Sequence, residues 1–202
     1  MTDKVLSTPA HVEPVVFTRD QLDWLPWLEP MAEQDLTARH MAGLVDAARA
    51  KSAYFMLLAR DPDILGARTR TDKDIFYNPN GGLPRAEREL ATVAVSYING
   101  CAYCASVHAR RFAELTKQPE VIQRLFNEGL DTELDPRRRA IVDYAAKLTR
   151  APQRMTSADL APLRAVGMTD LEILDLTHAA AMFAWANRLM QTLGEPVAPA
   201  KQ

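Results

Sequence analysis

Apolar residues recur at three- and four-residue spacing through most of this 202-residue chain, and this periodicity limits its fold more than any other feature. Such spacing places apolar side chains along one side of an α-helix, whereas a half-buried β-strand alternates apolar and polar residues. No segment of the chain alternates convincingly at period two. The sequence therefore predicts an all-α fold with about eight helices.

Prolines, glycines and capping residues divide the periodic part into separate helices. Pro62 stands at the start of one apolar run, and proline is well tolerated in the first turn of a helix. Thr169 precedes Glu172 by three residues, the spacing of a capping box. These signals predict helices over residues 35–61, 62–78, 84–98, 101–116, 119–129, 135–152, 156–167 and 169–194.

Two of these helices carry apolar stripes that we interpret as packing surfaces. In the first helix the stripe is Met41, Leu44 and Ala48; in the last it is Leu171, Leu174, His178, Met182, Trp185 and Leu189. His178 therefore reads as a core or interface histidine rather than a catalytic one. The neighbouring pair Asn187-Arg188 reads as a helix-packing or subunit contact, and neither His11 nor His40 has a context that suggests chemistry.

The first 33 residues differ from the rest of the chain. They hold four prolines and two tryptophans, with one short amphipathic piece, "RDQLDWLPWLEPM". We expect an irregular N-terminal arm over residues 1–33, a helical domain over 34–196 and a tail over 197–202. Trp24 and Trp27 are expected to anchor the arm onto the domain or onto a neighbouring subunit.

Charge and cysteine content exclude several classes of function. A net charge of −2 and a pI near 6.1 give no electrostatic basis for binding nucleic acid or an anionic membrane. No apolar run approaches the length of a membrane span, and the N-terminus does not resemble a signal peptide, so a cytoplasmic protein is expected. In that reducing compartment, two cysteines close in sequence indicate redox or metal chemistry more often than a structural disulfide.

Both cysteines lie in the stretch "NGCAYCASVHAR", residues 99–110. On one helix, Cys101, Cys104 and His108 share a face within two turns. Near a helix N-terminus a thiol ionises more easily, and an imidazole one turn further on can accept its proton. Two cysteines at this spacing can also close into a disulfide once one is oxidised. The stretch therefore offers an activated thiol, a resolving thiol and a base.

A catalytic base usually needs a partner that orients it, and Glu89 is the candidate. Glu89 precedes Cys101 by twelve residues, which on one straight helix would separate them by roughly 18 Å. If the chain turns at Asn99-Gly100, the two helices can pack together and bring Glu89 to His108.

The spacing E-x11-C-x2-C-x3-H, formed by Glu89, Cys101, Cys104 and His108, resembles the active-site pattern of the AhpD-like alkylhydroperoxidases of the all-helical carboxymuconolactone decarboxylase superfamily. The approach "GGLPRAERELATVAVSYINGCAYC" and the closing "FAWANRLMQTLG" are similar to that family's peroxidase-related branch. The resemblance extends from about Asp35 to Gly194 and implies an AhpD-like helical bundle.

The resemblance implies a thiol-dependent peroxidase that reduces alkyl hydroperoxides without a metal or organic cofactor. Cys104 would attack the peroxide and become a sulfenic acid, and Cys101 would donate a proton and then resolve it as a disulfide. His108 would relay protons while Glu89 holds it. Where well-studied members have a second histidine, this chain has Tyr103, a poor base near neutral pH. A dithiol reductant protein, lipoyl-type or thioredoxin-like, and a homo-oligomer are also implied.

Other readings of the same residues remain open. The cysteines could be plain core residues, or with His108 and Glu89 they could hold a metal, although ligands on one helix make a poor tetrahedral set. The dithiol could serve exchange or sensing without peroxidase turnover. A decarboxylase or lactone-processing enzyme of the same superfamily could use His108 as its base and need neither cysteine.

Overall fold

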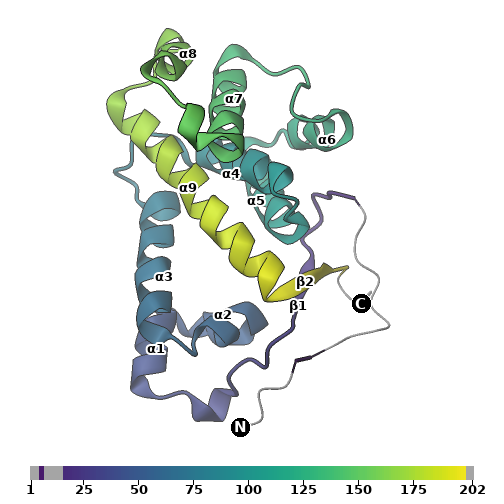
Figure 1. The fold of residues 1–202 in the computed structure, drawn as a ribbon, viewed down its shortest axis with the longest axis vertical. Coiled ribbons are helices and arrows are strands. Elements are labelled where there is room, and N and C mark those ends of the chain that lie inside the picture. The colour runs from purple at the N-terminus through teal and green to yellow at the C-terminus, as the bar shows by residue number, and fades with distance from the viewer. Residues whose placement is uncertain (1–4, 7–15, 199–202) are drawn as a thin grey trace.

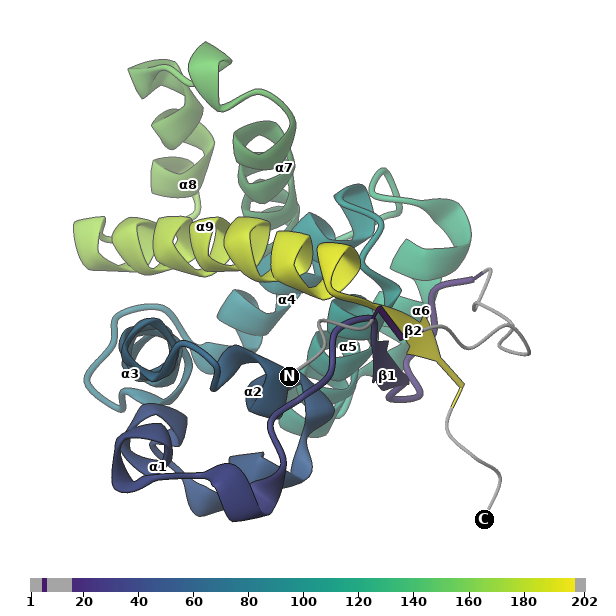
Figure 2. The same ribbon diagram turned by 60° about the horizontal axis from the view of Figure 1, so that its bottom comes forward.

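The longest helix, α9 (Asp170–Thr192), runs diagonally across the molecule between two groups of helices (Figure 1). Figure 2 shows α7 and α8 on one side of it and α1, α2 and α3 on the other. This computed structural model describes residues 5–6 and 16–198. The other helices are α1 (Ala38–Leu44), α2 (Ala53–Leu58), α3 (Pro62–Tyr77), α4 (Arg85–Ile98), α5 (Ala102–Thr116), α6 (Pro119–Glu128), α7 (Pro136–Arg150) and α8 (Ala161–Ala165), with short 3-10 turns at Glu33–Asp35, Ala47–Lys51, Pro152–Arg154 and Ser157–Leu160.

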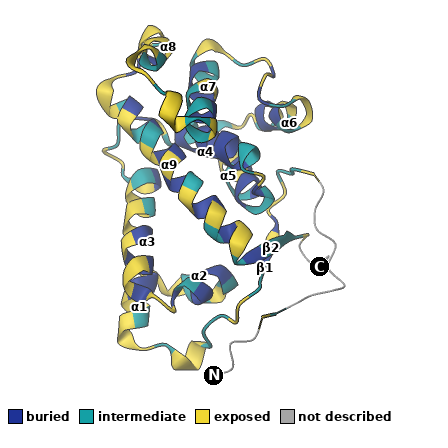
Figure 3. Cartoon of the chain, viewed as in Figure 1, coloured by how far each residue is buried: buried dark blue, intermediate teal, exposed yellow. Residues whose placement is uncertain are grey.

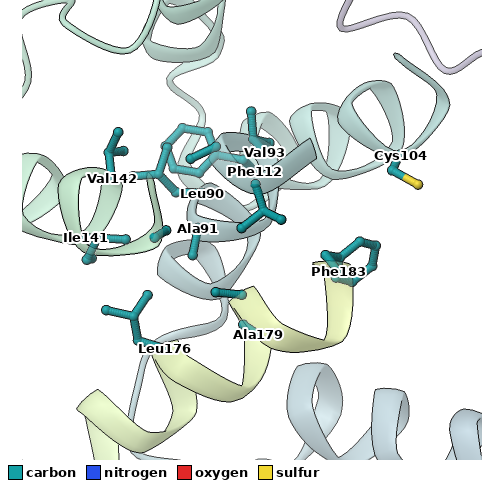
Figure 4. Packing of buried hydrophobic residues seen from close by; sticks show 14 of the residues in the cluster. Leu90, Ala91, Val93, Cys104, Phe112, Ile141, Val142, Leu176, Ala179 and Phe183 are labelled. Carbon is teal, nitrogen blue, oxygen red and sulfur yellow. The ribbon is translucent and has the colours of Figure 1, made fainter. Parts of the chain in front are cut away.

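Helix α4 forms the centre of the core. Leu90, Ala91 and Val93 on this helix are fully buried, and α5, α7 and α9 all pack against it. Figure 4 shows these side chains meeting those of the three neighbouring helices, with Cys104 at one end of the cluster. The arrangement confirms the predicted all-α fold, and the dark blue band through α4 in Figure 3 marks where burial is greatest.

From Pro62 onward most predicted helix boundaries agree with the structure within two residues. The prediction over 156–167 is wrong in part, because Ser157–Leu160 is a 3-10 turn and only Ala161–Ala165 is α-helical, and Gly194 begins β2 rather than ending the last helix. Asp61 caps α3 by accepting a hydrogen bond from the Ile64 backbone N–H at 3.3 Å. Thr169 and Glu172 form the expected capping box at the start of α9. These local contacts satisfy backbone groups that have no partner within the helix, which explains why capping residues in the sequence mark the ends well.

The single helix predicted over residues 35–61 is wrong. Helix α1 ends at Leu44 because Val45 takes a positive φ of 66°, and the Asp46 side chain then caps a new 3-10 turn. The stripe predicted for this helix is also wrong, since Met41 and Ala48 are exposed and only Leu44 is buried. Periodicity could not reveal the break because the apolar spacing continues through it.

The amphipathic piece of the N-terminal arm forms a strand, contrary to the expectation that the chain holds none. Residues Asp23–Pro26 (β1) pair antiparallel with Gly194–Val197 (β2), with Trp24 opposite Pro196. Trp24 is buried, and its indole N–H donates to the Met190 carbonyl at 3.0 Å. Strands of four residues are too short to show alternation, so their pairing could not be predicted.

The stripe predicted for the last helix packs against this chain only in part. Met182 is buried and Leu189 is half-buried, but Leu171, Leu174, His178 and Trp185 are exposed, and Trp185 keeps 41% of its surface accessible. Besides Met182, the buried face of α9 includes Leu176, Ala179, Phe183, Ala186 and Asn187. None of the helices in the described residues is long and apolar enough to cross a membrane.

Candidate active site

The chain reverses between α4 and α5 at the predicted turn. Asn99 ends α4, and Gly100 takes a φ of 76°, a conformation that favours glycine. The Cys101 backbone N–H then donates to the Ser96 carbonyl at 2.9 Å, and α5 packs back against α4. The two cysteines therefore lie at the start of α5, with Cys101 as its N-cap residue.

This reversal brings Glu89 to His108, as the sequence predicts. Oε2 of Glu89 lies 2.5 Å from Nδ1 of His108, and the Glu89 side chain is almost fully buried, with 1% of the residue's surface exposed. Arg85, one turn earlier on α4, donates from Nε to the other carboxylate oxygen at 3.1 Å. Arg85 is not among the residues predicted for the site, although its spacing of four residues from Glu89 is the signal of a helical ion pair.

Aromatic side chains fix the His108 ring from its other sides. The Phe183 ring lies edge-on to it, with centroids 4.1 Å apart, and the Phe76 ring lies at 5.5 Å. Because Nδ1 is held by Glu89, the nitrogen left to exchange a proton with a ligand is Nε2.

Both cysteines are reduced and nearly buried, with 2% of the surface of Cys101 and 4% of that of Cys104 exposed. Each nevertheless borders a cavity. Cys104 lines one of about 240 Å³ together with Glu89, His108 and Phe183, here named the Cys104 cavity. Figure 4 shows the Cys104 side chain on α5 and the Phe183 ring on α9 at the same end of the core.

Cys101 lines a separate cavity of about 220 Å³ with Trp24, Trp27 and Gln191, here named the Cys101 cavity. Its walls come from the N-terminal arm, the end of α9 and strand β2. The two sulfurs of the dithiol are therefore reached from different cavities, which sequence spacing alone did not reveal.

The two thiols differ in how easily they ionise. A hydrogen bond from Cys104, with a further one from Asn187, holds the pKa of Cys101 below its usual value despite burial. Burial raises the pKa of Cys104 well above its usual value, and the adjacent Cys101 adds to this effect. In the resting dithiol, negative charge is therefore held more easily on Cys101, with Cys104 as the hydrogen-bond donor.

Asn187 organises the sulfur end of the site. This fully buried amide donates to the Ser96 hydroxyl at 3.1 Å, accepts from the Asn99 side chain at 3.0 Å and hydrogen-bonds to both cysteines. The sequence alone predicts a packing or subunit contact at this position. A polar residue on the apolar face of a helix was the signal that could have identified it.

Tyr103 borders both cavities between the two cysteines. Burial raises the pKa of its phenol to about 12, and nearby Cys104 adds to the effect. Tyr103 therefore stays protonated at neutral pH and can donate a hydrogen bond but not act as a base.

The remaining histidines and the metal alternative find no support in the described residues. His40 bonds to Thr37 in an exposed cap, His178 is exposed on α9, and His11 lies outside the described residues. Within residues 5–6 and 16–198, no three His, Cys, Asp or Glu side chains are arranged to hold a metal ion.

Comparison with known proteins agrees with this geometry. The Carboxymuconolactone decarboxylase family matches residues 62–147 of the chain, which include both cysteines, His108 and Glu89. No curated protein matches the sequence.

Three solved structures share the fold. The alkylhydroperoxidase AhpD core protein of Ralstonia eutropha JMP134, an uncharacterized peroxidase-related protein, is 28% identical, with a TM-score of 0.70 over 81% of this chain and 87% of that one. The uncharacterized peroxidase-related protein of Silicibacter sp. TM1040 is also 28% identical, with a TM-score of 0.70 over 84% of this chain and 90% of that one. The debrominase Bmp8, at 15% identity and a TM-score of 0.68 over 85% and 91%, shares the fold alone. The family match and the two structures at 28% identity together support assignment of the chain to the superfamily of AhpD-like and carboxymuconolactone decarboxylase proteins.

Proposed function

We propose that this protein is a thiol-dependent peroxidase that reduces organic hydroperoxides by cycling Cys101 and Cys104 between dithiol and disulfide. The observation that carries the proposal is that Cys104 borders the same cavity as His108, whose Nδ1 lies 2.5 Å from the buried Glu89 carboxylate. A nucleophile beside a base that a third group orients is the arrangement that activates a thiol. The similarity to two peroxidase-related proteins agrees with this assignment.

The first chemical step is the attack on the peroxide. When His108 has accepted one of the two thiol protons, the two sulfurs share the other proton, and Cys104 is the nucleophile while that proton resides on Cys101. Cys104 attacks the terminal oxygen, the O–O bond breaks, and the departing alkoxide takes the proton from Cys101. The products are an alcohol and a Cys104 sulfenic acid.

The second step closes the disulfide. The Cys101 thiolate attacks the Cys104 sulfur, an S–S bond forms, and the departing hydroxide takes a proton held by His108 to leave as water. Glu89 stabilises the protonated ring before this transfer. Two thiols have then supplied two electrons, and the hydroperoxide has become an alcohol and water.

Turnover requires a dithiol reductant, lipoyl-type or thioredoxin-like, to return two electrons and two protons. The Cys101 cavity supports an approach to the disulfide that does not cross the peroxide cavity. Because the cytoplasm is kept reducing and supplies such dithiols, we propose that the protein acts there.

We also propose that the protein acts as a homo-oligomer. The support is the exposed apolar stripe of α9, formed by Leu171, Leu174, His178 and Trp185. A contiguous apolar face of this kind is typical of a subunit contact.

Dithiol exchange or sensing without peroxidase turnover is the second candidate. Two observations favour it: burial raises the pKa of Cys104, and Tyr103 cannot supply a second base. Stopped-flow oxidation of the reduced protein by a hydroperoxide, compared with oxidation by glutathione disulfide, separates the two functions. Faster oxidation by the disulfide would favour exchange.

Thiol counting after one equivalent of peroxide tests the proposal directly. We expect two thiols to be lost per chain, with mass analysis showing an intramolecular disulfide, and Cys104→Ser to abolish peroxide consumption. If Cys104→Ser consumes peroxide as fast as the wild type, the assignment is wrong. A decarboxylase or lactone-processing enzyme would instead keep its activity in a double Cys→Ser variant.

A further inference from the structure

Arg68 on α3 is a buried cation without a counter-ion in the described part of the chain. Only 6% of its surface is exposed, no acidic side chain lies within ion-pair distance, and neither Nε nor Nη1 has a hydrogen-bond acceptor. A buried charge is unfavourable unless it is paired and hydrogen-bonded. A group of this kind indicates an anion that the protein itself does not supply.

The other three arginines that border the Cys104 cavity differ from Arg68 because each has a carboxylate partner. The pairs are Arg49 with Asp72 at 4.0 Å, Arg85 with Glu89 at 3.1 Å and Arg111 with Glu114 at 2.9 Å. The positive charge left over in the wall of the cavity therefore belongs to Arg68. Arg49 also keeps one buried nitrogen, Nη1, without an acceptor and can add a donor beside it.

A second unpartnered donor lies next to Arg68. The Tyr54 hydroxyl on α2 is buried and its O–H has no acceptor, while the Arg68 guanidinium, 5.8 Å from the centre of the ring, interacts with the phenol oxygen. Burial raises the pKa of Tyr54 to about 12, so the phenol stays protonated and offers its O–H. A planar guanidinium with a hydroxyl beside it matches the oxygens of a carboxylate.

The rest of the cavity is suited to an apolar body. Phe55, Phe76 and Phe183 form part of its wall, and Cys104 lies in the same wall as Arg68. The charge of Arg68 acts on the Cys104 thiol, although burial outweighs it. A volume of about 240 Å³ is small for a ligand site and excludes a long lipid chain.

We propose that Arg68 and Tyr54 bind the carboxylate of the substrate, which is a small hydroperoxide with an apolar or aromatic body and a carboxylate remote from the peroxide group. The identification of the substrate as a hydroperoxide rests on the proposed function; the carboxylate site rests on the cavity alone. In this pose the anion is held at α2 and α3 while the peroxide group is left for Cys104 on α5.

Cumene hydroperoxide and its para-carboxylate derivative are a matched pair of probes, since they differ only in the charged group. For the wild type we expect kcat/KM to be roughly tenfold or more higher for the carboxylate, the size of one charge-assisted contact. In Arg68→Gln this ratio falls to about one or below. The ratio cancels any general effect of the substitution on the reactivity of Cys104.

Arg70→Gln is the matched control, because Arg70 is exposed on the same helix and does not border the Cys104 cavity. It should keep the wild-type ratio. Arg68→Lys retains the charge and guards against a folding defect, and we expect an intermediate ratio. Equal kcat/KM for the two probes in the wild type, or an unchanged ratio in Arg68→Gln, would overturn the carboxylate site.

A binding measurement separates failure of this inference from failure of the peroxidase proposal. Titration calorimetry with para-isopropylbenzoate, which has no peroxide group, should give saturable binding to the wild type and at least tenfold weaker binding to Arg68→Gln. If the benzoate binds in this way but neither hydroperoxide is consumed, the carboxylate site stands and the peroxidase assignment fails. If both hydroperoxides are consumed equally and the benzoate does not bind, the peroxidase assignment stands and the carboxylate site fails.

Discussion

Oε2 of Glu89 and Nδ1 of His108 lie 2.5 Å apart although 19 residues separate them in the chain. Glu89 comes from α4 and His108 from α5, and the turn at Gly100 brings the two helices together. Arg85 holds the second oxygen of the carboxylate at 3.1 Å. The carboxylate is thus fixed by two partners, and it in turn fixes one nitrogen of the imidazole.

Replacing this carboxylate tests the proposed relay. Glu89→Gln keeps the shape of the side chain but removes the charge that stabilises protonated His108. We expect kcat/KM for a hydroperoxide to fall by roughly 10²-fold, within the range for loss of general acid–base assistance. Glu120→Gln, which changes an exposed carboxylate on α6 that borders neither cavity, is the control and should keep near wild-type activity. Wild-type rates in Glu89→Gln would rule out the relay.

The hydrogen bond between the thiols predicts a shift in the reactivity of Cys101. Cys104→Ala removes the donor that lowers the pKa of Cys101, so burial then dominates and this pKa rises. In alkylation by iodoacetamide, measured against pH, the midpoint for Cys101 should move to higher pH than in the wild-type dithiol. A midpoint that stays in place would show that Cys104 does not stabilise the Cys101 thiolate.

Tyr103 offers a gain-of-function test. Burial holds the pKa of the Tyr103 phenol at about 12, so the side chain is no base below pH 9. Tyr103→Phe should therefore change the rate of peroxide reduction in this pH range by less than about threefold. A larger loss would show that the O–H contacts the peroxide. Tyr103→His introduces a base with an ordinary pKa of about 6.5. We expect peroxide reduction to increase and its pH profile to gain a titration near neutrality. No gain in Tyr103→His would show that His108 alone supplies the relay.

The unpaired charge of Arg68 predicts that this residue favours binding of a carboxylate but lowers the stability of the ligand-free protein. In Arg68→Met an unpaired buried cation is replaced by an apolar side chain, which should raise the free energy of unfolding by roughly 1–4 kcal/mol. The melting temperature should therefore rise by roughly 2–15 °C. Calorimetry of the ligand-free protein checks this, with Arg70→Met as the control. A decrease would indicate that a carboxylate of a partner subunit neutralises Arg68.

The exposed face of α9 predicts a specific effect on assembly. Leu174 lies on this face with half of its surface accessible, so Leu174→Glu adds a charge without disturbing the core. We expect this variant to dissociate into smaller species in sedimentation experiments while its far-ultraviolet circular dichroism stays unchanged. The control is Ile64→Glu, which alters an exposed apolar residue on α3 away from the stripe. If both variants sediment like the wild type, the stripe is not a subunit contact.

The helical fold could be predicted from the sequence because its signals are local. Caps such as Asp61 and Thr169 act within one turn, and apolar residues at three- and four-residue spacing indicate a helix whether that side faces the core or the surface. The pairing of Glu89 with His108 was also predictable, because one turn at Asn99-Gly100 suffices to bring them together.

Features that depend on distant segments could not be predicted. Strand β1 exists only because the chain returns to it 168 residues later, as in the pairing of Pro26 with Gly194. Arg68 and Asn187 enter the site from helices that spacing around the cysteines does not reach. The exposed face of α9 carries the same apolar residues that a core-facing stripe would, so periodicity indicates a packing surface without telling whether it faces the core of this chain.

Separate cavities for Cys101 and Cys104 have a kinetic consequence. In a two-step cycle with a single pocket, the hydroperoxide and the reductant compete for the same space. Excess reductant then slows the step in which the peroxide oxidises the enzyme. In the proposed peroxidase cycle, the alcohol product and the incoming dithiol would use distinct routes, so regeneration would begin before the product departs. We therefore expect a peroxidase with these two cavities to avoid the double-substrate inhibition that arises when oxidant and reductant share one opening.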